Sequence, residues 1–228
     1  MRALVLVYQG SSDKALEQRP VPEISASTDA IVKVTRTTIC GTDLHILNGD
    51  VPSCQPGRVL GHEGLGVVHQ IGPSVTTFRP GERVLISCIT SCGKCVYCRK
   101  QMYSHCTSGG WILGNKIDGT QAEYVRIPYA DTSLYRIPDD ADDESLVMLS
   151  DILPTGFECG VLNGKVQPGR RGRNRAAYRS NLFTDALFLR LGNSNGRGKA
   201  APPRATLLKG VRDAIATMTR GYEHGLPA

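Results

Sequence analysis

Residues 92–106 read CGKCVYCRKQMYSHC, and this segment holds half of the eight cysteines of the chain. The spacing of Cys92, Cys95, Cys98 and Cys106 is C-x2-C-x2-C-x7-C. Thiolates this close in sequence can converge on one tetrahedral ion, and four sulfur ligands without an open position are typical of structural zinc. A pair of disulfides is the alternative, but no secretory context accompanies the segment. The spacing therefore predicts a loop that a structural zinc ion fastens to the fold.

A second, different set of metal-ligand residues precedes this loop. Residues 40–45 read CGTDLH and residues 61–63 read GHE. Cysteine and histidine are good zinc ligands, a carboxylate is an acceptable one, and a catalytic zinc keeps one position open. In isolation, Cys40 and His62 would more simply be a buried thiol and a hydrogen-bonded core histidine. The wider pattern of residues 61–75 favours a metal site instead.

Short strand-like segments separated by Gly and Pro indicate a mainly β fold from residue 1 to about residue 138. We expect strands over residues 2–8, 30–37, 63–71, 83–87, 122–127 and 133–137. The acidic residues 142–144 favour a helix N-terminus. We therefore expect a helix from about residue 141 to near residue 160, which Pro154 could kink or interrupt.

The pattern GHE-x2-G-x5-G-x2-V over residues 61–75 fits, at every position, the signature of the zinc-containing medium-chain alcohol dehydrogenases, which this chain resembles. The CGTDLH segment, the signature and the four-cysteine loop occur in the family's order, and the resemblance covers roughly residues 1–169. It implies that residues 1–150 form a zinc-binding catalytic domain, an irregular β-barrel like that of the GroES chaperonin. Residues 151–169 would begin the connection to a nucleotide-binding domain.

The resemblance also implies a set of catalytic zinc ligands. Cys40 and His62 match two ligand positions, and Glu63 matches a neighbouring carboxylate that can approach the metal. The third stable ligand varies in the family among Cys, Glu and Asp, and Asp151 occupies the matching segment. The alternative for Asp151 is a surface aspartate at a helix.

Two residues match the family's proton relay. Thr42 corresponds to the hydroxyl residue that takes the alcohol proton, and His45 corresponds to the histidine that passes it to solvent. The alternative for His45 is an ordinary surface imidazole. The resemblance implies two zinc ions per chain, NAD or NADP, and a small alcohol, aldehyde or ketone as substrate. A homo-oligomer is compatible with it.

Residues 170–228 read differently from the rest and form an atypical basic tail. They carry ten Arg and two Lys against two Asp and one Glu, whereas the whole chain has a formal net charge of +6. Family members continue from this point into an apolar strand and a Gly-x-Gly-x-x-Gly loop that binds the cofactor pyrophosphate. The tail shows neither feature, so a complete Rossmann domain is lacking and the cofactor-binding residues are unknown. A shift of reading frame near Gly169 is one hypothesis that would account for the change, and a genuine replacement domain is the alternative.

This composition predicts that the tail is poorly ordered and that the chain as it stands is impaired as an enzyme, because nothing would hold the hydride acceptor in place. The alternative is a non-catalytic zinc-binding barrel fragment with a basic tail that binds nucleic acid. The tail lacks a recognition motif, so nucleic acid is the less favoured partner.

The first residues do not resemble a signal peptide, and no apolar stretch is long enough to cross a membrane. We therefore expect a cytoplasmic protein without a membrane partner.

Overall fold

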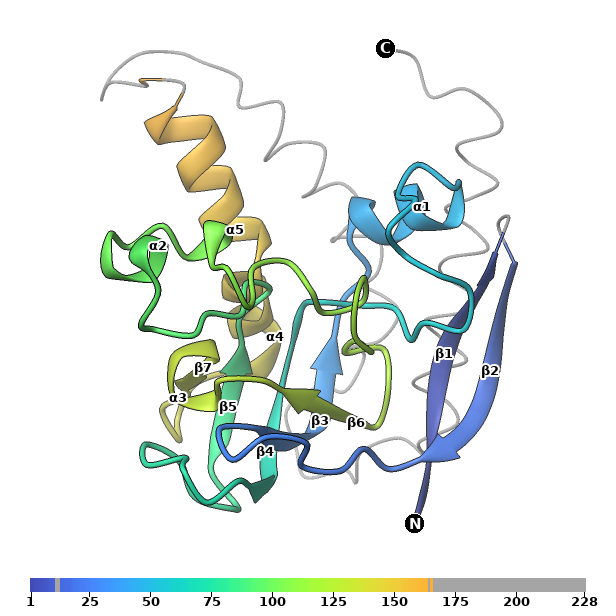
Figure 1. Ribbon diagram of the computed structural model, residues 1–228, viewed down its shortest axis with the longest axis horizontal. Coiled ribbons are helices and arrows are strands. Elements are labelled where there is room, and N and C mark those ends of the chain that lie inside the picture. Colours follow the sequence, from blue (N-terminus) through green and yellow to red (C-terminus); the bar gives the residue numbers. More distant parts are fainter. Residues whose placement is uncertain (11–12, 164, 166–228) are drawn as a thin grey trace.

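The computed structural model describes residues 1–10, 13–163 and 165, and the predicted mainly β fold is confirmed within them. The described strands form an antiparallel hairpin and a five-stranded antiparallel sheet with the order β6-β3-β4-β5-β7. Figure 1 shows the hairpin on one side of this sheet and the last helical segment on the other. The strands are β1 (Arg2–Gly10), β2 (Asp13–Pro20), β3 (Ala30–Thr37), β4 (Gly64–Ile71), β5 (Arg83–Ile86), β6 (Tyr124–Ile127) and β7 (Leu134–Arg136).

Strand β2 is the strand that the sequence did not predict. Its sequence, DKALEQRP, has few apolar residues, and most of its side chains are exposed or half-buried. The backbone pairing with β1 along nearly its whole length determines the strand, from Arg2 opposite Pro20 to Gly10 opposite Asp13. A local pattern does not report such a strand, in which Leu16 packs against a core cluster but no side chain is fully buried.

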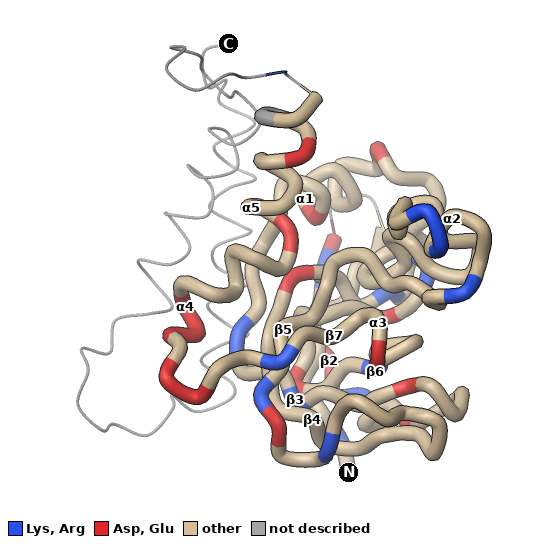
Figure 2. Tube along the Cα trace, turned by 90° about the vertical axis from the view of Figure 1, so that its left-hand side faces the viewer, with Lys and Arg blue, Asp and Glu red and all other residues tan. Residues whose placement is uncertain are grey.

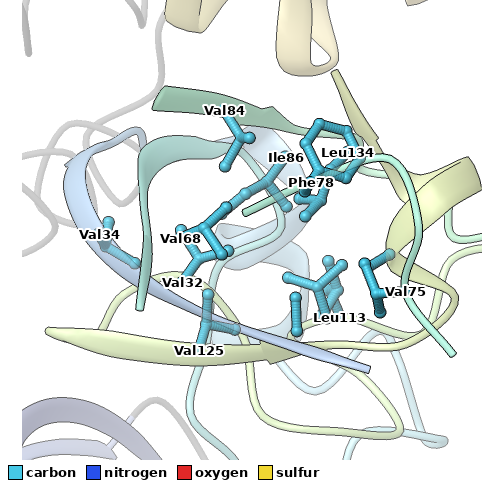
Figure 3. Packing of buried hydrophobic residues seen from close by; sticks show 13 residues of the cluster. Val32, Val34, Val68, Val75, Phe78, Val84, Ile86, Leu113, Val125 and Leu134 are labelled. Atoms are coloured by element: carbon cyan, nitrogen blue, oxygen red, sulfur yellow. The ribbon is translucent and has the colours of Figure 1, made fainter. Parts of the chain in front are cut away.

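The sheet buries side chains on both faces, because successive residues of a strand point in opposite directions. Val32 and Val34 of β3 enter the largest core cluster, whereas Ile31 between Ala30 and Val32 enters a separate cluster with Tyr124. Figure 3 shows the side chains of the largest cluster converging from β3, β4, β5 and β6 and from the loops that carry Val75, Phe78 and Leu113.

The helices of the described chain are short. They are α1 (Gly41–Leu47), α2 (Val96–Arg99), α3 (Ala130–Ser133), α4 (Asp143–Leu146) and α5 (Ile152–Thr155), with 3-10 turns at Tyr103–His105 and Val147–Ser150 and a π-helical stretch at Gly156–Leu162. Among the described residues, none of these helices has both the length and the apolar character that a membrane crossing needs.

The helix predicted from about residue 141 to near residue 160 is present but interrupted. The break lies at Asp151, whose φ of −148° and ψ of −60° are not helical. Pro154, three residues later, lies in the first turn of α5, where the absent N–H is not needed. Proline therefore permits a new helix to start here, and the interruption itself lies before it.

An acidic segment leads into α4 and is held to the sheet by one arginine. Figure 2 shows acidic residues gathered along this stretch of the chain. The guanidinium group of Arg83, in β5, donates to the carbonyl oxygens of Pro138 (3.0 Å), Asp139 (2.9 Å) and Ala141 (2.9 Å) and pairs with Asp143. Arg83 therefore fixes the path of the chain on its way to Asp151. The predicted basic tail, residues 170–228, lies outside the described residues.

Gly66 sits where β4 passes very close to β3. A Cβ atom on Gly66 would lie 2.2 Å from the carbonyl oxygen of Lys33 and 2.8 Å from Cγ1 of Val32. We predict that Gly66→Ala lowers the free energy of unfolding by roughly 1–3 kcal/mol, because backbone atoms must move to admit the methyl group. Urea denaturation measures this. Gly41→Ala is the matched control, since its Cβ would meet nothing within 4 Å, and equal stability of the two variants would contradict the prediction.

Candidate metal centre

The four cysteines of residues 92–106 come together as the spacing predicts. One sulfur atom from each lies within 4.8 Å of the others, and all four thiols are free. The N–H of Cys98 donates to Sγ of Cys95 (3.4 Å), and the N–H of Cys92 donates to Sγ of Cys106 (3.3 Å). The first of these bonds arises because Cys95 occupies the position just before α2, where backbone N–H groups point back along the chain.

The environment of this loop favours negative charge on the sulfur of Cys95 and opposes it on the sulfur of Cys98. Hydrogen bonds from the backbone N–H groups of Cys98 and Thr107 lower the pKa of Cys95 to about 5. Burial, together with the thiol of Cys95, raises the pKa of Cys98 to about 12. The closely spaced sulfurs therefore cannot all carry a negative charge unless a cation lies among them. A divalent cation would displace the remaining proton and compensate the charge of the thiolates, as zinc does in structural sites.

The second group contains the four residues to which the sequence assigned the catalytic metal. Ligand atoms of Cys40, His62, Glu63 and Asp151 all lie within 4.8 Å of one another. Nε2 of His62 lies 3.2 Å from Oδ2 of Asp151. His62 and Glu63 are each only 3% exposed, whereas Cys40 and Asp151 are half-buried. The group is therefore enclosed on one side and open to solvent on the other.

Asp43 joins the two sequence segments that supply Cys40 and His62. Its buried carboxylate accepts hydrogen bonds from the N–H of Cys40 (2.9 Å), the N–H of Gly61 (3.2 Å) and Nε2 of Gln121 (3.1 Å). Burial raises the pKa of Asp43, although these donors and His62 act in the opposite direction. The bonds fix the backbone on which each ligand is carried.

Gly61 allows the turn that presents His62. Its φ is +92°, and a Cβ atom there would lie 2.7 Å from Oγ1 of Thr120 and 2.8 Å from the backbone nitrogen of Gln121. A side chain at this position is excluded both by the positive φ and by the neighbouring backbone. The glycine of the GHE motif is therefore required by the approach of residues 120–121.

Ser150 holds Asp151 close to Cys40, His62 and Glu63, which precede it by about 90 residues or more in the sequence. Its hydroxyl accepts from the N–H of Gly64 (3.0 Å) and donates to the carbonyl oxygen of Ile86, while the N–H of Cys88 donates to its carbonyl oxygen (3.2 Å). One buried serine thus bonds to β4, to β5 and to the segment after β5. The residue that follows it is consequently held beside His62.

The charges of the group favour a cation at its centre. Burial lowers the pKa of His62, but hydrogen bonds to Asp151 and Cys40 and the negative charge of Asp43 outweigh it and raise that pKa well above its ordinary value. Burial raises the pKa of Glu63 to about 7, although the hydroxyl of Thr38 donates to its carboxylate. The raised pKa of His62 means that the site stabilises a positive charge on the imidazole, and the raised pKa of Glu63 means that its carboxyl group holds a proton more strongly than usual. Both effects are expected where several negatively charged groups lie close together.

A buried carboxylate oxygen of Glu63 supports the fit of these residues to a metal ion. Among the described residues, Nδ1 of His62 and Oε1 of Glu63 have no hydrogen-bond partner. Leaving such a group unsatisfied costs about 1–3 kcal/mol. Thiolate, imidazole and carboxylate are the zinc donors of proteins, and Oε1 of Glu63 is an unused acceptor within the group. The donor set and its orphaned oxygen match the chemistry that zinc requires.

The two residues of the predicted proton relay lie on α1. Oγ1 of Thr42 is 3.6 Å from Sγ of Cys40, and His45 follows three residues later, one turn along the helix. Nδ1 of His45 is 2.9 Å from Oδ2 of Asp50, and both side chains are 57% exposed. Thr42 is thus next to the group formed by Cys40, His62, Glu63 and Asp151, and His45 is in contact with solvent.

The sequence did not identify every residue that shapes this site. Trp111, for which the sequence left open either a place in the substrate cleft or a packing role, packs against a core cluster and also stands edge-on to His62, with ring centroids 6.2 Å apart. Burial raises the pKa of Cys88, and the negative charges of Asp151 and Glu63 raise it further, which places this thiol beside the group. Neither Ser150 nor Cys88 has a local sequence signal, because both act through tertiary contacts. Asp43 did have one, since it lies inside the CGTDLH motif.

Comparisons with known proteins agree with this fold and these motifs. Residues 26–139 match the alcohol dehydrogenase GroES-like domain family. A medium chain reductase/dehydrogenase of Acremonium sp is 41% identical over 152 residues, which are 67% of this chain and 52% of that protein. The structure of zinc dependent alcohol dehydrogenase 2 from Streptococcus pneumonia, in its apo form, is 50% identical with a TM-score of 0.68, covering 74% of this chain and 47% of that one.

A second similar structure contains a nicotinamide cofactor. It is an alcohol dehydrogenase (rspB) from E. coli CFT073 complexed with NADH, 31% identical with a TM-score of 0.60, covering 72% of this chain and 45% of that one. The chain thus spans about half the length of the proteins that it matches. The described part has the mainly β architecture of the GroES-like domain of zinc alcohol dehydrogenases, as the sequence predicted. This chain therefore belongs to the alcohol dehydrogenase GroES-like domain family.

Proposed function

We propose that this chain supplies the metal-binding catalytic domain of a zinc-dependent oxidoreductase, which transfers a hydride between an alcohol and NAD or NADP. The observation that carries the proposal is the group of Cys40, His62, Glu63 and Asp151, gathered on the scaffold of a family whose members include zinc alcohol dehydrogenases. In this proposal residues 1–150 are the catalytic domain and residues 151–169 start the connection to a cofactor-binding domain.

The proposal places zinc at both clusters. The four thiols of residues 92–106 would hold a structural ion, and Cys40, His62 and Asp151 would hold a catalytic ion, with Glu63 able to approach it. A zinc ion at the second cluster would supply a Lewis acid for an alcohol or carbonyl oxygen. The half-buried positions of Cys40 and Asp151 leave an approach from solvent for that oxygen.

Thr42 and His45 would move the proton. Oγ1 of Thr42 is placed 3.6 Å from Sγ of Cys40, where it can accept the hydroxyl proton of a bound alcohol. His45 lies one helical turn further toward solvent, and Asp50 holds its Nδ1, so its second ring nitrogen can exchange a proton with water. The enclosed side of the site, where His62 and Glu63 are buried, limits the access of water to the reacting atoms.

The chain by itself should catalyse hydride transfer slowly. Residues 170–228, which lie outside the described residues, contain no Gly-x-Gly-x-x-Gly loop, so the sequence shows no means of holding the nicotinamide next to the alcohol. The alternative function, a non-catalytic zinc-binding barrel, predicts bound zinc that does not respond to alcohols. A nucleic-acid role for the basic tail, a cytoplasmic location and a homo-oligomeric state stay predictions from the sequence.

We predict that the purified full chain binds two zinc ions and that Cys98→Ala reduces this to one, because one ligand of a closed four-sulfur site is lost. Cys54→Ala should retain both ions, since Cys54 is a buried thiol outside the two clusters. Metal analysis after gel filtration measures the content, and circular dichroism checks the fold. Two ions in Cys98→Ala would argue against the structural site.

A second prediction concerns an open position on the metal. In the cobalt-loaded full chain, a small alcohol or ketone should change the visible cobalt spectrum. The response should survive Cys98→Ala and disappear in Cys40→Ala. Cys40→Ala should also weaken metal binding at the second cluster by more than about 100-fold, because losing a ligand costs more than losing a residue that only orients one. A spectrum that no alcohol or ketone alters would favour the non-catalytic barrel.

A third prediction tests hydride transfer. Residues 1–162 can replace the matched part of the Streptococcus enzyme, which shares 50% identity. We expect alcohol-dependent reduction of NAD⁺ or NADP⁺, followed by absorbance, and a fall of roughly 100-fold or more in kcat for Thr42→Val, because the acceptor of the alcohol proton is removed. The unmodified Streptococcus enzyme is the control. A chimeric enzyme that binds zinc but oxidises no alcohol would contradict the proposal.

A further inference from the structure

Asp151 stands at a helix start without acting as its cap. It is the residue just before α5, a position where an aspartate side chain normally accepts a hydrogen bond from the second or third N–H of the helix. Its carboxylate makes no such bond. The third helical residue is Pro154, which has no N–H to offer. The sequence of α5 therefore removes one of the two donors that would otherwise compete for this carboxylate.

Thr155 supplies a different hydrogen bond to the same carboxylate. It lies four residues after Asp151, on the same side of the helix, and its N–H donates to the carbonyl oxygen of Asp151 (2.8 Å). Its hydroxyl donates to Oδ1 of Asp151. The other oxygen, Oδ2, is the one that lies 3.2 Å from Nε2 of His62. The two carboxylate oxygens therefore have different partners and face different ways.

We propose that Thr155 is a positioning residue that occupies Oδ1 of Asp151, so that Asp151 offers Oδ2 alone to the catalytic metal. The inference rests on the proposed function, since it takes Asp151 as a metal ligand. Partners of this kind orient a ligand and fix which of its atoms binds. Without the hydroxyl, the carboxylate can rotate and present both oxygens, or turn toward the N–H groups at the start of α5.

The surroundings of Thr155 separate this role from a general structural one. The side chain is exposed, so removing its hydroxyl opens no cavity in the core. Ser150, by contrast, is buried and bonds to two strands, so its replacement would disturb the fold along with the site. Thr155 is thus the partner of Asp151 that can be altered while the scaffold is kept.

The test uses the full chain and compares Thr155→Val with Thr155→Ser. Valine keeps the branched shape and loses the hydroxyl, whereas serine keeps the hydroxyl. Competition with a chelator should show zinc at the Cys40 cluster bound roughly 10–100-fold more weakly in Thr155→Val and nearly as tightly as in the unchanged chain in Thr155→Ser. Zinc at the four-cysteine cluster serves as the internal control and should be held equally in all three proteins.

The cobalt spectrum provides a readout that a structural role would not move. A carboxylate that binds through two oxygens raises the coordination number, so the visible bands of cobalt at the Cys40 cluster should weaken in Thr155→Val and be restored in Thr155→Ser. Urea denaturation of the metal-free proteins should give similar unfolding free energies. Unchanged zinc affinity and spectrum in Thr155→Val would overturn the inference, as would an equal loss in Thr155→Ser.

Asp151→Asn distinguishes the two levels of the argument. If Asp151→Asn weakens zinc binding and Thr155→Val does not, the role of Thr155 is wrong and the metal site stands. If Asp151→Asn leaves zinc binding unchanged, the proposed ligand set itself is wrong, and the inference fails with it.

Discussion

The buried carboxylate of Asp43 is the interaction on which the rest of this site depends. It binds the backbone of Cys40 and of Gly61 together, so two chain segments that follow and precede different strands are held in one geometry. Gln121 adds a third contact from a distant loop. Because the carboxylate is withdrawn from water, each of these bonds is strengthened, and the loss of any one would leave a costly unpaired group. The scaffold of the metal cluster is therefore a polar network inside a mainly apolar fold.

The fourth member of the cluster arrives by a different physical route. Val147, three residues before Ser150, packs with Leu65 and Leu85 on the sheet, and Arg83 holds the acidic segment upstream of it. Apolar packing thus sets the position of the segment, and the hydroxyl of Ser150 sets its register against β4 and β5. Asp151 reaches the site because the helix breaks there, which gives its side chain a direction that a continuous helix would not allow.

The four-cysteine cluster and the Cys40 cluster differ in how their surroundings stabilise negative charge. In the cysteine loop, backbone N–H groups donate to the sulfur atoms of Cys95 and Cys106, and four thiol donors lie around one centre. In the other cluster, burial and mixed donors leave His62 and Glu63 with unpartnered atoms and leave Cys40 and Asp151 accessible. The first arrangement suits an ion that only fastens a loop, and the second suits one that a substrate can reach.

The sequence by itself determined the mainly β fold, the family, and the convergence of the four cysteines, because alternating strands and closely spaced ligands are local features. It also placed Asp151 with Cys40 and His62, although only through resemblance. Strand β2, the break at Asp151 and the contacts of Ser150, Cys88 and Thr155 were decided by the tertiary structure alone. The physical reason is that these features depend on partners that lie across the fold or on the direction of a side chain, and neither is written in a local pattern.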